Sequence, residues 1–115
     1  MVNSQLTSNT GTGFTMRFEN GMTISVQFSS MHYCTNRRNK NGVSIKRQYD
    51  FADGVHSPDA EVMIWQEKDG ETIDSTNQFG WVSADVVGRL IPIVQDSKSV
   101  QDFLDNERAL QLINP

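Results

Sequence analysis

An Asn-Gly pair flanked by alternating apolar residues is the feature that most constrains this fold. Phe14, Met16 and Phe18 precede the pair Asn20-Gly21. The apolar residues that follow it are Met22, Ile24, Val26 and Phe28. Alternation with a period of two is typical of a strand that buries one face. Because Asn and Gly both tolerate the positive φ angles of a type I′ turn, residues 14–28 are predicted to form an antiparallel hairpin.

A second pair of strands is predicted beyond the middle of the chain. Residues 61–66 alternate between two apolar faces, as a strand does. These faces are Val62 with Ile64 and Met63 with Trp65. The pair Asp69-Gly70 then turns the chain into a short partner strand over residues 71–74. Trp65 and Trp81 are interpreted as packing residues of the core or its rim.

Polar segments precede and separate these strands. The alternation stops over residues 29–41, where several Asn residues indicate a loop. The pair Asn41-Gly42 predicts another hairpin onto residues 43–51, in which the apolar alternation is only partial. Residues 1–13 are mostly Asn, Ser, Thr and Gly, so they have little to bury. We therefore predict a flexible N-terminal arm, which can become ordered against a neighbouring subunit.

The last third of the chain carries helix signals. Ser83 is a good N-cap for a helix that begins directly after it. Pro92 lacks a backbone N–H, so it is expected to kink this helix or to end it just before the proline. A last helix is predicted over residues 100–113, with Ser97 or Ser99 as its N-cap.

The order of strands first and helices last predicts an α+β fold. We expect an antiparallel sheet of four to five strands, built from hairpins, with two C-terminal helices packed on one face. The chain of 115 residues has room for one domain. We assign residues 14–115 to that domain and residues 1–13 to the arm.

Charge is divided between the two halves of the chain. Residues 1–47 carry six cations and one acid, whereas residues 48–115 carry four cations and thirteen acids, for a net charge of −4. Five of the six N-terminal cations lie between Arg37 and Arg47. Opposite local fields of this kind bear on partners and association rather than on fold.

The basic cluster and the residues just before it form the candidate site. We predict that it binds an anion, and its residues are Tyr33, Asn36, Arg37, Arg38, Lys40, Lys46 and Arg47. Arginine forks bind phosphate or carboxylate through two hydrogen bonds. Tyr33 can stack on a base, and N–H groups of the loop backbone can cradle an anion. Two alternatives remain: the cations form a solvated face or pair with acids of the second half, or the basic loop meets the acidic half of another subunit.

No residue pattern indicates catalysis, a metal or a cofactor. His32 and Cys34 are two positions apart, a spacing that points side chains to opposite faces of an extended chain, and no orienting acid is identifiable. The set His32, Cys34, His56 and Asp59 matches no recurrent metal spacing. No apolar run is long enough to span a membrane. A single cysteine and the lack of a signal-peptide pattern lead us to expect a reducing cytoplasm.

Residues 18–27 have the pattern F-x-N-G-x-x-x-S-V-Q, and residues 33–37 have the pattern Y-C-x-N-R. This phrase followed by this loop resembles small uncharacterised proteins encoded by tailed bacteriophages. Residues 60–62 and 82–87 resemble their later strand and helix start, so the resemblance covers about residues 14–95. It implies no activity, but it implies the cytoplasm of the host cell as the setting and an accessory role such as counter-defence.

These observations favour a non-enzymatic binding protein. Its basic loop would capture an anionic small molecule, such as a nucleotide signal, or a host protein. The alternative is a homo-oligomer that assembles through its charge asymmetry and has no small-molecule ligand. Weak nucleic-acid binding is a second alternative, permitted by the local positive charge, but the net charge of −4 argues against it.

Overall fold

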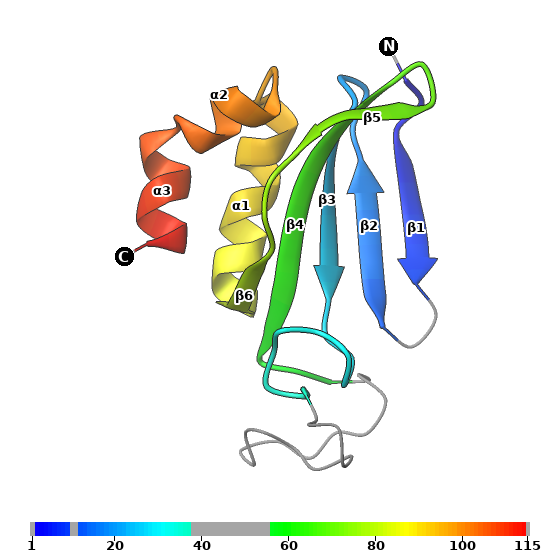
Figure 1. Cartoon of the computed structure of the whole chain (residues 1–115). Helices are drawn as coiled ribbons and strands as arrows, with labels where there is room; N and C mark the ends of the chain where they lie inside the picture. The colour runs from blue at the N-terminus through cyan, green and yellow to red at the C-terminus, as the bar shows by residue number, and fades with distance from the viewer. Residues whose placement is uncertain (1, 10–11, 38–55, 115) are drawn as a thin grey trace.

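An antiparallel sheet forms the centre of the fold in the computed structural model, which describes residues 2–9, 12–37 and 56–114 (Figure 1). Its strands are β1 (Gln5–Asn9), β2 (Gly13–Arg17), β3 (Met22–Gln27), β4 (Asp59–Lys68), β5 (Glu71–Ser75) and β6 (Phe79–Ser83). The sheet order is β1-β2-β3-β4-β5, and β6 also pairs with β4. The helices are α1 (Ala84–Asp96), α2 (Val100–Leu104) and α3 (Glu107–Ile113). The predicted α+β class is confirmed. The described residues form six strands and three helices, and β1 and β6 are strands that the sequence did not predict.

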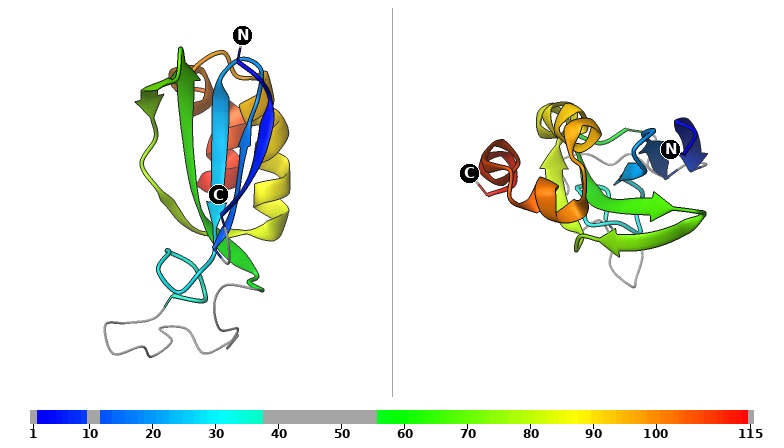
Figure 2. Two further views of the ribbon diagram at one scale, coloured as in Figure 1. Left: turned by 90° about the vertical axis from the view of Figure 1, so that its right-hand side faces the viewer. Right: turned by 90° about the horizontal axis from the view of Figure 1, so that it is seen from above.

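The helices lie on one side of the sheet and close the core there (Figure 2). The main strand contribution comes from the inward faces of β3 and β4, where Ile24 lies directly opposite Ile64. The buried core consists of Met22, Ile24, Val26, Ala60, Val62, Ile64, Val82, Val87, Leu90, Ile93, Val94, Val100, Phe103 and Ala109. The predicted alternation in β4 is confirmed, because Val62 and Ile64 are buried and Met63 and Trp65 belong to the opposite, helix-free face.

The predicted hairpin around Asn20-Gly21 is confirmed, but its turn differs from the expected type I′. Gly21 has a φ of 85°, whereas Asn20 is not among the residues with positive φ. The N–H of Gly21 donates to the carbonyl of Phe18 at 2.9 Å, which gives a longer turn with one left-handed glycine. The Asn20 amide instead donates to the carbonyls of Ser97, at 2.7 Å, and Gln95, at 3.1 Å. The Oδ1 of Asn20 also accepts the N–H of Met22 at 3.0 Å, so its side chain bonds both the turn itself and the end of α1.

Residues assigned to the flexible arm in fact contribute a strand. β1 pairs with β2 over five residues, from Gln5 opposite Arg17 to Asn9 opposite Gly13. Backbone pairing requires no apolar side chain, and four of the five β1 residues are exposed. Composition therefore gave the wrong prediction for this segment, because an edge strand can form without contributing much to a core.

Helix α1 runs through Pro92 and ends at Asp96. The predicted cap is confirmed, since the Ser83 hydroxyl accepts the N–H of Val86 at 3.2 Å. Pro92 removes the hydrogen bond to the carbonyl of Gly88, but both residues are exposed, so water can solvate that carbonyl. The buried residues on the other side hold the helix in place beyond the proline. Of the two outcomes predicted for Pro92, the end of the helix just before it is wrong, and the kink stays a prediction.

The single helix predicted over residues 100–113 is two helices. Ser99 caps α2 by accepting the N–H of Asp102 at 3.0 Å, and Asn106 caps α3 by accepting the N–H of Ala109 at 3.1 Å. An Asn side chain that bonds the backbone in this way starts a new helix rather than continuing the old one. None of the helices in the described residues is long and apolar enough to cross a membrane.

Two predicted features lie outside the described residues. They are the hairpin turn Asn41-Gly42 and the strand over residues 43–51. The cations Arg38, Lys40, Lys46 and Arg47 of the candidate site lie outside them as well.

Candidate functional site

The loop over residues 29–37 carries the described part of the predicted site. It is tied to its surroundings by Asn36, whose amide group donates to the carbonyls of Phe28, at 2.9 Å, and His56, at 2.7 Å. Cys34, Thr35 and Asn36 are all buried. The loop is therefore a packed element at the end of the sheet, and it holds its exposed residues in defined positions.

Two carboxylates of β4 fasten this loop to the sheet. Asp59 accepts both the N–H and the hydroxyl of Thr35, at 2.6 and 2.7 Å, and Glu61 accepts the N–H of Tyr33 at 2.9 Å. N–H groups of the loop backbone were predicted to cradle an anion. Acids of the protein occupy these two, so neither is open to an external anion.

Three side chains converge on the outer surface of the loop: Tyr33, Arg37 and Trp81. The guanidinium carbon of Arg37 lies 4.2 Å from the centre of the Tyr33 ring, in a cation–π contact. The rings of Tyr33 and Trp81 are 5.8 Å apart at a tilt of 49°. Tyr33 is 43% exposed and Trp81 39% exposed. We call these three residues the Tyr-Arg-Trp cluster.

Strand β6 brings Trp81 to the loop through an unusual backbone. Its N–H donates to the carbonyl of Tyr33 at 2.8 Å. Trp81 has a φ of 52°, a left-handed conformation that costs a bulky residue about 1–2 kcal/mol. The pairing of β6 with β4 shifts register between Ala60 and Val62, next to this position. Gly80 allows the close approach, because a Cβ there would lie 2.9 Å from the Cβ of Tyr33.

The charge of Arg37 is not neutralised by a described carboxylate. Among the residues that the structure describes, the one ion pair joins Arg17 and Glu67 at 3.3 Å. Stacking on Tyr33 covers a face of the guanidinium and leaves its N–H edge as a planar fork. Such a fork matches the oxygens of a phosphate or carboxylate.

Two further features lie near the cluster. The Oδ1 atom of Asn36 is buried and has no hydrogen-bond donor within the described chain. A groove of about 470 Å³ runs between β6 and the end of α3 and includes Trp81, Phe79 and Ile113 in its lining. This volume lies in the range of small-molecule sites.

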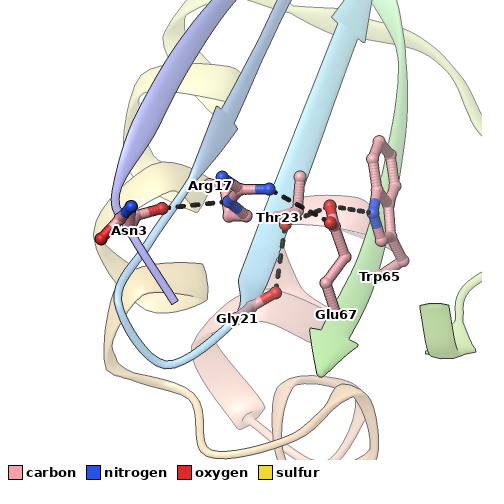
Figure 3. Close-up of polar contacts among 6 residues, drawn as sticks. All are labelled: Asn3, Arg17, Gly21, Thr23, Trp65 and Glu67. Carbon is pink, nitrogen blue, oxygen red and sulfur yellow. Dashed lines mark hydrogen bonds and ion pairs between the residues drawn. The ribbon is translucent and has the colours of Figure 1, made fainter. Parts of the chain in front are cut away.

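The Arg17–Glu67 ion pair belongs to a separate network on the helix-free face (Figure 3). Glu67 also accepts the indole N–H of Trp65 at 3.0 Å and lies 3.5 Å from the hydroxyl of Thr23. Arg17 donates in addition to the carbonyl of Asn3 at 3.0 Å. Because these groups bond one another across β2, β3 and β4, the network connects three strands of the sheet. Arg17–Glu67 is also the one ion pair among the described residues that joins the basic and the acidic half of the chain.

The thiol of Cys34 is buried and donates to the carbonyl of Ser29 at 3.3 Å. Burial raises its pKa, with a smaller contribution from the nearby Asp59 carboxylate. A thiol in this state is a poor nucleophile. The described residues contain no group of three or more His, Cys, Asp or Glu side chains that could hold a metal ion.

We expect Cys34 to resist alkylation while the protein is folded. At pH 7.5 iodoacetamide should modify it at least about 100-fold more slowly than in urea, because the thiol is shielded and protonated. The pKa of this thiol is higher in the folded protein than in the unfolded chain, where it is about 8.5. Ionisation of the thiol should therefore lower the free energy of unfolding only above about pH 8.5. Mass spectrometry of the alkylated protein and urea unfolding between pH 7 and 10 check both points. Equal alkylation rates in the two states would contradict them.

The structure thus brings together three of the residues that the sequence singled out, Tyr33, Asn36 and Arg37. It adds Trp81, which was interpreted as a packing residue, and the two supporting acids Asp59 and Glu61. No pattern in the sequence places Trp81 beside Tyr33, because strand pairing and a register shift decide that contact. Comparison with protein-family models, with curated proteins and with solved structures finds no match.

Proposed function

We propose that this protein is a non-enzymatic binding protein that captures an anionic small molecule carrying a flat ring, such as a nucleotide. The observation that carries the proposal is the Arg37 guanidinium stacked on Tyr33 beside Trp81, with no described carboxylate paired to it. The guanidinium edge binds the anionic group through two hydrogen bonds. The exposed ring surfaces of Tyr33 and Trp81 take the flat part of the ligand.

The packing under the cluster favours a preformed site. Asp59, Glu61 and Asn36 hold the loop before any ligand arrives. A site that is already ordered loses less conformational entropy when it binds. The strained backbone of Trp81 supports the same interpretation, since strain of this kind clusters at functional sites.

A binding role without catalysis agrees with the chemistry of the site. The single thiol of the chain is buried, and it donates a hydrogen bond to a backbone carbonyl. The carboxylates of Asp59 and Glu61, which support the loop, accept its N–H groups. The proposed setting is that of a phage accessory protein in the host cytoplasm, and it rests on the resemblance of residues 14–95 to phage-encoded proteins.

Native mass spectrometry of protein freshly purified from cells tests the proposal directly. We expect extra mass of nucleotide size, and we expect nucleoside mono-, di- and cyclic phosphates added to the stripped protein to quench tryptophan fluorescence. Arg37→Ala should weaken binding at least about 100-fold, because it removes two charge-assisted hydrogen bonds of about 1.5–3 kcal/mol each. Arg37→Lys keeps the charge but loses the fork, so it should recover only part of the affinity.

Arg89→Ala is the matched control, because Arg89 lies on the exposed face of α1. It removes the same charge and should leave the affinity unchanged. An equal loss of binding in Arg37→Ala and Arg89→Ala would mean that net charge, not the cluster, attracts the ligand. If the purified protein retains no extra mass and no nucleotide of the panel changes its fluorescence, the proposal is wrong.

A further inference from the structure

We propose that the outer edge of β1 is a dimerisation surface, on which the β1 strand of a second copy of the chain pairs in antiparallel orientation. β1 ends the sheet on one side, and no strand among the described residues pairs with its outer edge. The N–H and C=O groups along such an edge are a template for another strand. This inference concerns a different surface from the Tyr-Arg-Trp cluster and does not depend on ligand binding.

The two edges of the sheet differ in how they are protected. β5 carries Glu71 and Asp74, and its pairing with β4 is interrupted by a bulge between Gln66 and Glu67. Charges and bulges are the usual devices that prevent edge pairing. β1 has the sequence QLTSN, with no charge and no proline, and it pairs with β2 in unbroken register. The open edge of β1 therefore lacks the protection that β5 has.

Leu6, Met16 and Phe14 form an apolar surface at β1 and β2, which we call the apolar shelf, and no described helix covers it. Helix α1 packs mainly on β3, β4 and β6, and β1 lies at the side of the sheet away from the helices (Figure 1). Leu6 is 74% exposed, and its neighbour across the strands, Met16, is only partly buried. Phe14, on the same face of β2, is partly buried too. These residues extend the core beyond the reach of the helices.

A second copy fits this edge better than an unrelated strand does. Antiparallel pairing of two identical strands is self-complementary, because a two-fold axis perpendicular to the sheet relates them. That axis keeps the helix layers of both copies on the same side and brings the two apolar shelves together. The uncharged β1 strands meet without repulsion, although each chain carries a net charge of −4.

Leu6→Lys and Ile73→Lys form a matched pair for the test. Each replaces an exposed apolar residue of an edge strand by lysine. Leu6, in β1, is 74% exposed, and Ile73, in β5, is 54% exposed. By sedimentation velocity from about 5 to 500 µM, we expect the wild type and Ile73→Lys to be dimers at the upper end. We expect Leu6→Lys to remain monomeric with an unchanged circular dichroism spectrum.

A wild type that is monomeric throughout, or a Leu6→Lys variant that dimerises as the wild type does, would overturn the proposal. Equal loss of dimer in both variants would also overturn it, since the effect would not be specific to β1. Hydrogen exchange of the unmodified protein provides a test without substitution. Protection of the peptide that contains β1 should rise with concentration, and protection of the β5 peptide should not. A concentration-dependent change at β5 alone would count against β1.

Discussion

Replacing Gly21 by alanine is expected to cost the protein at least about 4 kcal/mol of its free energy of unfolding, a large share of the 5–15 kcal/mol typical of a domain. Gly21 has a φ of 85°, and a Cβ at this position would lie 2.1 Å from the carbonyl oxygen of Glu67. That oxygen belongs to the backbone of β4, and the N–H of Glu67 donates to the Gly21 carbonyl at 2.9 Å. Room for a methyl group thus requires β3 and β4 to separate where their pairing begins.

Gly70→Ala is the matched control for this prediction. Gly70 has nearly the same φ, 81°, and also lies in a hairpin turn, but a Cβ there would meet nothing within 4 Å. It should cost only the left-handed backbone penalty of about 1–2 kcal/mol. Urea unfolding followed by circular dichroism measures both variants. Equal losses would show that the contact between Gly21 and Glu67 is not tight in solution.

The same comparison shows what the sequence can and cannot predict about a turn. Both Asn20-Gly21 and Asp69-Gly70 were correctly predicted to reverse the chain. The two positive φ angles of a type I′ turn occur at Asp69, with 54°, and Gly70, with 81°. At the other turn the Asn20 side chain bonds the end of α1 instead. Turn propensity is local, whereas these contacts of Asn20 join residues that are distant in sequence.

The errors in the fold have a common cause. β1 forms because β2 offers it a backbone edge, α1 continues past Pro92 because buried residues on both sides of the proline hold it, and Asn106 divides the last helix by capping. In each case the local composition or propensity favoured the predicted structure, whereas a contact stabilises the structure that is observed. The alternating core strands were predictable because burial of one face requires an apolar residue at every second position, and this pattern is visible in the sequence.

The candidate site was predictable in its cationic and aromatic residues but not in its support. Tyr33, Asn36 and Arg37 follow one another closely, so the sequence alone could group them. Trp81 reaches them through strand pairing, which sequence spacing does not reveal. Asp59 was considered only as a member of a metal set, and Glu61 was given no role, yet both accept N–H groups of the basic loop.

Asp59→Ala is the second substitution for which we expect a large effect, a loss of about 3 kcal/mol in the free energy of unfolding. It removes two hydrogen bonds to a charged group, each about 1.5–3 kcal/mol, and leaves the N–H of the buried Thr35 without its acceptor. Entry of water into the loop recovers part of this loss. Urea unfolding gives the total, and hydrogen exchange should show the amides of Tyr33 and Thr35 losing protection.

Two further variants separate the hydrogen bonds from the charge. Asp96→Ala removes an exposed carboxylate at the end of α1 and should change the stability by less than about 0.5 kcal/mol. Asp59→Asn should lie between the two, because its amide oxygen can still accept the Thr35 N–H. If Asp59→Ala keeps its loop amides protected, the carboxylate does not hold the loop. If protection is lost, Arg37 and Tyr33 lose their fixed positions as well, and capture of the anion should weaken in the same variant. Asp59, from the acidic half of the chain, would then position Arg37, from the basic half.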